Sequence, residues 1–188
     1  MHNMVVDTRQ KIRGRENLVH DVLRRQQAGE RGVFTNGCFD LLHLGHVRYL
    51  QEARALGDFL ILGLNSDESV RLLKGPGRPL MPENERAEIL AALTCIDYVT
   101  IFAEPTAGPL VENVRPAIYV KGGDYALAGD ALEVPDTSRL PEARVVEAYG
   151  GTVRLISYLP HHSTSELIEA IKQLPGEPGW GQAPEART

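Results

Sequence analysis

The chain has 188 residues, enough for one domain with a substantial hydrophobic core and little left for a second. Hydrophobic residues make up 43% of it and charged residues 24%, values that exclude a disordered chain and a fibrous one. The net charge of -5 excludes a general attraction to nucleic acid, so an anionic ligand must be held by a local group of donors.

The sequence also bears on location and metal content. No stretch approaches the roughly 18 consecutive apolar residues of a membrane span, and the first residues lack the apolar segment of a signal peptide. We therefore expect a cytoplasmic protein with no membrane and no nucleic acid as partner. Cys38 and Cys95 lack metal-ligand spacing and are too few for a disulfide framework, so we predict no metal held by protein side chains.

Apolar periodicity predicts short buried strands that alternate with helices. A lead-in helix is expected within residues 17–30. Strands are expected at 32–35, 58–65, 97–102, 117–123 and 152–159, and helices at 44–56, 67–73, 83–93, 106–114 and 163–174. In the helix at 83–93, we expect Ile89, Leu90 and Leu93 to face inward. Such an alternation is typical of an α/β protein whose mostly parallel sheet is covered by helices on both faces.

The same pattern divides the chain into three segments. Residues 1–30 form a lead-in segment with its helix, and residues 31–174 form the main domain. Residues 175–188 are rich in proline and glycine and have no apolar period, so we predict a disordered tail there.

The loop after the first strand carries the residues that point most directly to chemistry, because ligands of open parallel sheets bind at the carboxyl ends of strands. His43 and His46 flank Gly45 at the start of a predicted helix, where free N–H groups and the helix dipole attract anions. Three positions apart, both imidazoles can face one polyphosphate, and Gly45 would let it approach the backbone. The alternative is a pair of exposed helix histidines. The chain has neither a GxxxxGK[ST] loop nor a GxGxxG turn after the first strand, which argues against a P-loop kinase and a dehydrogenase.

The sequence GCFDLLHLGH, residues 37–46, resembles the GxFDxxHxGH signature of the cytidylyltransferase-like nucleotidyltransferases, which share a Rossmann-like fold. Further blocks are similar to the adenylyltransferase module of ADP-heptose biosynthesis, which supplies a lipopolysaccharide precursor. They are LKGPGRPLMPENERAEILAAL, IDYVTIF, VKGGDY and STS. The resemblance extends over roughly residues 30–174 and implies a Rossmann-like three-layer sandwich.

The resemblance implies an activity and a site. AMP would pass from ATP to a sugar 1-phosphate, D-glycero-β-D-manno-heptose 1-phosphate, with release of pyrophosphate; Mg²⁺ would accompany the nucleotide, and the chain would form a homodimer. The catalytic residues would be His43, His46 and Lys74. The nucleotide-binding residues would be Asn36, Gly37, Cys38, Phe39, Asp40, Gly45, Arg78, Lys121, Gly122, Asp124, Ser163, Thr164 and Ser165.

Several alternatives remain at this stage. Ser163 to Glu166 also reads as a capping box, and Lys74 and Arg78 could be solvated surface charges. His161 and His162 stand where this branch has a glycine-containing stretch, and the segment 126–138 is longer than usual in the branch. CTP with glycerol 3-phosphate or another alcohol phosphate therefore stays open, as do GTP and a nucleotide-binding module without turnover.

Overall fold

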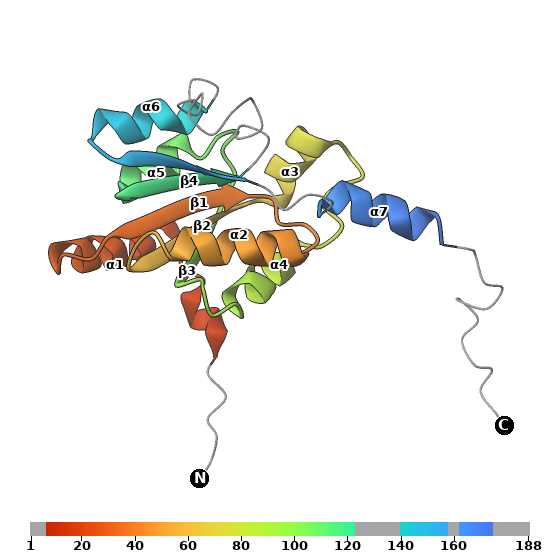
Figure 1. The fold of residues 1–188 in the computed structure, drawn as a ribbon, viewed down its shortest axis with the longest axis horizontal. Coiled ribbons are helices and arrows are strands. Elements are labelled where there is room, and N and C mark those ends of the chain that lie inside the picture. Colours follow the sequence, from red (N-terminus) through yellow and green to blue (C-terminus); the bar gives the residue numbers. More distant parts are fainter. Residues whose placement is uncertain (1–6, 123–139, 158–161, 175–188) are drawn as a thin grey trace, which may run out of the picture.

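The computed structural model describes residues 7–122, 140–157 and 162–174. Its centre is a sheet in the order β3-β2-β1-β4-β5, shown in Figure 1. The strands are β1 (Gly32–Gly37), β2 (Phe59–Asn65), β3 (Tyr98–Phe102), β4 (Ile118–Gly122) and β5 (Thr152–Ile156). All four pairings are parallel, so the expected α/β class with a parallel sheet is confirmed.

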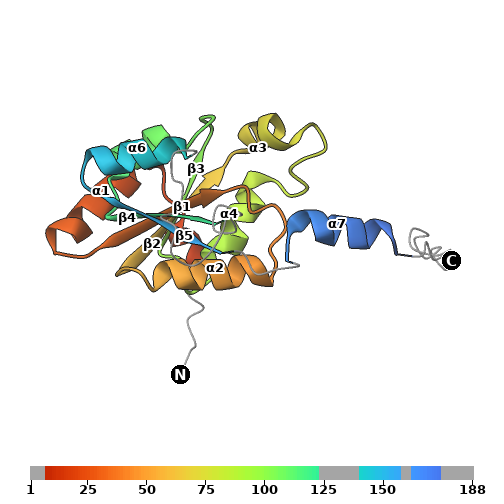
Figure 2. The same ribbon diagram turned by 45° about the horizontal axis from the view of Figure 1, so that its top comes forward.

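Helices connect the strands and cover both faces of the sheet. They are α1 (Arg15–Gln27), α2 (Leu44–Arg54), α3 (Asp67–Lys74), α4 (Glu83–Ala91), α5 (Gly108–Val114), α6 (Pro141–Ala148) and α7 (Thr164–Lys172), with a 3-10 helix η1 (Thr8–Lys11) before them. Figure 2 shows α2 and α6 on opposite sides of the sheet. The helix α6 was not predicted, because a helix of eight residues is too short to show a clear apolar period in the sequence. No helix within the described part of the chain is long and apolar enough to cross a membrane.

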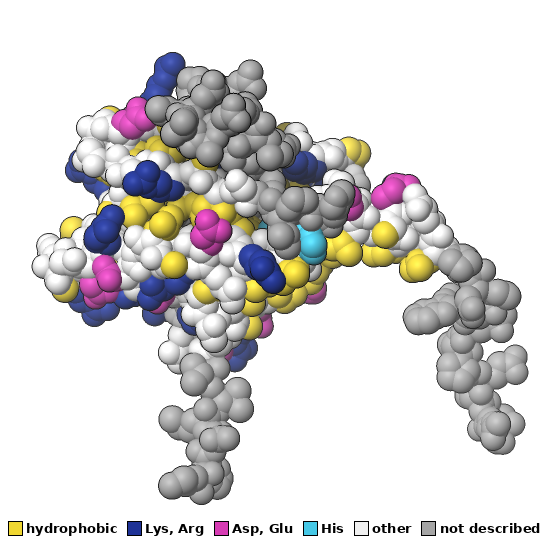
Figure 3. Space-filling model, viewed as in Figure 1, with side chains coloured by type: hydrophobic (Ala, Val, Ile, Leu, Met, Phe, Trp, Pro, Cys, Tyr) yellow, Lys and Arg dark blue, Asp and Glu magenta, His cyan; other side chains and the backbone are white. Residues whose placement is uncertain are grey.

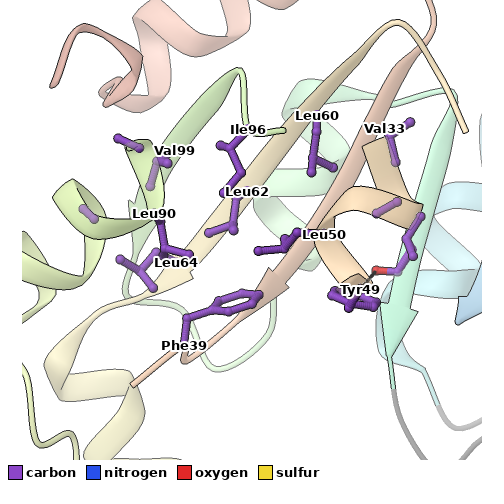
Figure 4. Close-up of a cluster of buried hydrophobic side chains, with 14 of the residues drawn as sticks. Val33, Phe39, Tyr49, Leu50, Leu60, Leu62, Leu64, Leu90, Ile96 and Val99 are labelled. Carbon is purple, nitrogen blue, oxygen red and sulfur yellow. Dashed lines mark hydrogen bonds between the residues drawn. The ribbon is translucent and has the colours of Figure 1, made fainter. Parts of the chain in front are cut away.

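Two hydrophobic clusters hold these layers together. On one face, Leu50 from α2 and Leu90 from α4 pack against Leu62 of β2, as Figure 4 shows. On the other face, side chains of α1, α5 and α6 pack against the sheet; they include Leu18, Val22, Leu110, Val111 and Val146. The lead-in helix α1 thus contributes directly to the core.

The buried side of α4 differs from the expected one. Ile89 is 41% exposed, whereas Arg86 is 1% exposed and faces inward together with Leu90. The prediction for Ile89 was wrong, because an apolar pattern assigns an arginine to the solvent side. This buried cation is important for the site described below.

The strand order places a topological switch point beside β1. The chain runs outward from β1 to β2 and β3 on one side, and β4 and β5 lie on the other side. Connections therefore diverge between β1 and β4, and such a switch point is where open α/β sheets bind ligands. Asn36 near the end of β1 and Lys121 near the end of β4 lie at this edge.

The last helix, α7, extends away from the sheet beyond the carboxyl ends of the strands (Figure 1). None of its residues is buried, and its apolar side chains Leu167 and Ile171 are exposed. Figure 3 shows hydrophobic side chains along this helix. The amino-terminal end of α7 makes the contacts with the rest of the chain that matter for the site.

We expect Leu50→Ala to lower the free energy of unfolding by about 2–5 kcal/mol, because it opens a cavity in a fully buried cluster. Leu23→Ala is the control: Leu23 is 51% exposed, so its truncation should change stability by less than about 1 kcal/mol. Urea unfolding followed by circular dichroism measures both. Equal losses in the two variants would contradict the assignment of Leu50 to the core.

Candidate active site

The loop between β1 and α2 brings two histidine rings together. His43 is the N-cap of α2, and its Nδ1 accepts a hydrogen bond from the backbone N–H of His46 at 3.4 Å. The rings of His43 and His46 stack with their centroids 3.8 Å apart, and the ring of Phe39 lies 5.1 Å from that of His46. The pair thus forms a compact unit at the start of the helix.

Burial keeps this pair uncharged. Burial and, to a lesser extent, the neighbouring His43 lower the pKa of His46 to about 4. Burial also lowers the pKa of His43, and the charge of His162 acts in the same direction, whereas Glu166 opposes it. At neutral pH both rings are therefore neutral, and the neutral His43 ring carries its proton on Nε2 because Nδ1 accepts.

A glycine on each side of this loop, at the end of β1 and in the first turn of α2, allows close packing. A Cβ on Gly37 would lie 2.9 Å from the ring of Phe39. The backbone of Phe39 has a positive φ of 43°. A Cβ on Gly45 would lie 3.1 Å from the carbonyl oxygen of His162. The backbone of His162 therefore lies against Gly45, at the place where a phosphate was expected to approach the helix.

A second group of polar side chains lies between the ends of β1 and β4. The Nζ of Lys121 lies 3.3 Å from Oδ1 of Asn36, which also accepts from the hydroxyl of Tyr119 at 2.8 Å. Burial lowers the pKa of the Lys121 ammonium group. Lys74, exposed at the end of α3, is close enough for its charge to act on both Lys121 and the Cys38 thiol. Burial is nevertheless the larger effect on Cys38 and raises its pKa.

Asp40 fixes the loop that follows α3. Its buried carboxylate accepts hydrogen bonds from the backbone N–H groups of Leu80 at 2.7 Å and Met81 at 3.1 Å. Its other oxygen lies 2.6 Å from Nε of Arg78. Asp40 thus orients this loop, and its carboxylate holds Arg78.

Arg86 is the residue that sequence reasoning missed. Its side chain is fully buried and donates to the carbonyl oxygens of Cys38, Asn65 and Met81 at 2.5, 3.0 and 2.9 Å. It also donates to Oδ1 of Asp67 at 2.6 Å. Its position could have indicated its burial, because Arg86 stands four residues before the buried Leu90 and so lies on the same helix face. An arginine on such an apolar face requires buried acceptors.

The amino-terminal end of α7 joins the same loop. Ser163 and Glu166 form a capping box, so the Ser163 hydroxyl is used within the helix. The Thr164 hydroxyl donates to the carbonyl oxygen of Leu41 at 3.4 Å, while Ser165 is exposed in the first turn. Residues 162–164 therefore lie beside the two stacked histidines.

Most of the sequence-predicted site residues thus lie at one edge of the sheet. One group lies at the starts of α2 and α7 and consists of His43, Gly45, His46 and Thr164. A second group lies at the ends of β1 and β4 and consists of Asn36, Lys121 and Gly122. Asp124, His161 and the segment 126–138 lie outside the described residues. Within the described ranges, no group of three or more His, Cys, Asp or Glu side chains could hold a metal ion.

Comparison with known proteins assigns the family. The family model described as cytidylyltransferase-like matches residues 34–169. The chain belongs to this cytidylyltransferase-like family. The matched residues include the histidine pair, Asp40, Arg86 and the start of α7, so the family model spans the candidate site.

Relatives of this cytidylyltransferase-like chain include longer proteins. The bifunctional protein HldE of Syntrophotalea carbinolica is 56% identical over 86% of this chain and 31% of its own length. The bifunctional protein HldE of Geobacter sulfurreducens is 50% identical over 89% of this chain and 32% of its own length. The chain thus spans about a third of these relatives. The chain is also similar to a solved crystal structure, that of the lipopolysaccharide core biosynthesis protein from Thermoplasma volcanium. The two share 29% sequence identity and a TM-score of 0.52, and the match covers 70% of this chain and 98% of the Thermoplasma protein.

The lowered pKa of His46 predicts a pH dependence of stability. In the unfolded chain His46 titrates near 6.5, and in the folded chain near 4, so between these values the unfolded state binds more protons. The stabilisation is complete above pH 6.5 and is lost as the pH falls toward 4. Between pH 7 and pH 5, we expect the melting temperature of His46→Asn, measured by calorimetry, to fall less than that of the wild type. His20→Asn, at an exposed position, should lose as much as the wild type; an equal loss for His46→Asn would contradict the assignment.

Proposed function

We propose that this chain is a nucleotidyltransferase that transfers AMP from ATP to a sugar 1-phosphate, D-glycero-β-D-manno-heptose 1-phosphate, to give ADP-heptose and pyrophosphate. The observation that carries the proposal is the neutral, stacked pair of His43 and His46 at the start of α2. The resemblance of the LKG, VKGGDY and STS blocks to the ADP-heptose branch supports the choice of substrates.

The reaction needs no protein nucleophile. An oxygen of the sugar phosphate attacks the α-phosphorus of ATP, the bond to the bridging oxygen breaks, and its electron pair leaves with pyrophosphate. Negative charge therefore builds on the triphosphate, and neutral imidazole N–H groups are donors that can stabilise it. Nε2 of His43 is such a donor, because Nδ1 already accepts from the helix backbone.

Two lysines supply positive charge. Lys121 lies at the end of β4 beside Asn36, and Lys74 follows at the end of α3, where Gly75 with a φ of 95° begins the next loop. A bound polyphosphate would favour the charged form of the Lys121 ammonium group, which opposes the effect of burial on its pKa. Arg78 reaches the same region, but its guanidinium is already paired with Asp40; its remaining N–H groups would be the ones to contact a phosphate.

Mg²⁺ fits this arrangement as part of the nucleotide substrate. Mg²⁺ keeps several waters and is usually bound through substrate phosphates, so it would enter the site with the nucleotide. The protein residues would then bind the outer oxygens of the same phosphates. A homodimer in the cytoplasm completes the proposal.

A substrate screen tests this function. We expect pyrophosphate release to be fastest with ATP and the heptose 1-phosphate, with kcat/KM for ATP above the values for CTP and GTP. Equal or higher kcat/KM with CTP, or turnover of glycerol 3-phosphate only, would replace the proposal by the cytidylyltransferase alternative. Nucleotide binding without any pyrophosphate release would indicate a module without turnover.

We expect His43→Ala and His46→Ala each to lower kcat about 10²–10³-fold, the usual effect of removing a preorganised donor. His46→Asn keeps an N–H donor and should retain part of the rate. His20→Ala is the control, since the side chain of His20 is 78% exposed on α1. Near wild-type rates for both alanine variants would place the reaction elsewhere.

A further inference from the structure

His162 lies against the start of α2, although it belongs to the segment before α7. A Cβ on Gly45 would stand 3.1 Å from the Cβ and from the carbonyl oxygen of His162, and 3.0 Å from Nδ1 of His43. The segment at 162 and the ring of His43 therefore meet at the same buried glycine. A residue 117 positions away from Gly45 in sequence is thus part of the wall of the site.

Residue 162 also affects the titration of His43. Burial is the main cause that lowers the pKa of His43, and a charge on His162 lowers it further. The side chain of His162 is partly buried. Glu166, the other charge that acts on His43, accepts from the backbone N–H of Ser163 at 2.9 Å and is held in the capping box.

Two helix starts converge at this point. His43 caps α2, Ser163 caps α7, and the Thr164 hydroxyl reaches the carbonyl oxygen of Leu41. The first turns of both helices carry backbone N–H groups without helical partners, which favour an anion. His162 lies between them, next to the histidine pair.

We propose that His162 is a third imidazole of this site and binds the triphosphate of the nucleotide together with His43 and His46. This inference rests on the proposed function and adds to it a binding residue outside the HxGH sequence. A hydrogen bond from this ring would hold the phosphates before and during transfer alike. Its loss should therefore weaken nucleotide binding and leave kcat nearly unchanged.

Calorimetric titration with inorganic tripolyphosphate tests the inference without requiring turnover. We expect His162→Ala to bind about tenfold more weakly than the wild type, the effect of losing one hydrogen bond to a charged group. KM for ATP should rise by a similar factor. His162→Gln, which retains an N–H donor, should recover part of the affinity, and His20→Ala should bind like the wild type.

The outcomes separate this inference from the proposed function. An unchanged affinity of His162→Ala, in a chain that binds tripolyphosphate and releases pyrophosphate, overturns the role of His162 and leaves the function intact. A lower melting temperature with unchanged affinity also overturns it, because His162 would then only support the fold. A wild-type chain that neither binds tripolyphosphate nor releases pyrophosphate overturns both.

Discussion

The architecture of the site depends on the burial of one arginine. The guanidinium of Arg86 is removed from water and is stabilised by three carbonyl oxygens and the carboxylate of Asp67. A buried cation without such acceptors would be strongly unfavourable, so these groups must converge on it for the chain to fold. They come from the β1–α2 loop, the end of β2, the start of α3 and the loop before α4. One side chain thus determines how four segments meet at the sheet edge.

Asp40 and Arg78 complete this framework. Asp40 binds two backbone N–H groups of the loop before α4 and the guanidinium of Arg78 from the same loop. Arg86 and Arg78 thereby hold loops, and Lys74 and Lys121 supply further positive charge at this sheet edge. In the proposed reaction the neutral imidazoles then act as donors, because the fixed loops position them and burial lowers their pKa values.

The sequence predicted the elements that follow from local patterns. Strands such as 58–65 are continuous apolar runs, and the stacked histidines could be expected because a three-residue spacing at a helix start puts both rings on one side. What escaped prediction depends on contacts between distant segments. Arg86 could not be recognised as buried without knowing that the carbonyls of Cys38, Asn65 and Met81 converge on it. The sequence indicated Gly45 as a position for close approach of a phosphate, whereas the structure places His162 against it, which local reasoning cannot foresee.

The most direct test of this account is a comparison of Arg86→Lys with Arg48→Lys in unfolding and turnover. Lysine keeps the charge but cannot reach all four acceptors, so we predict that Arg86→Lys lowers the free energy of unfolding by about 3 kcal/mol and lowers kcat with it. Arg48, exposed on α2, should tolerate the same change. A loss of kcat at unchanged stability would contradict the account, since Arg86 would then act on the substrate and not on the framework.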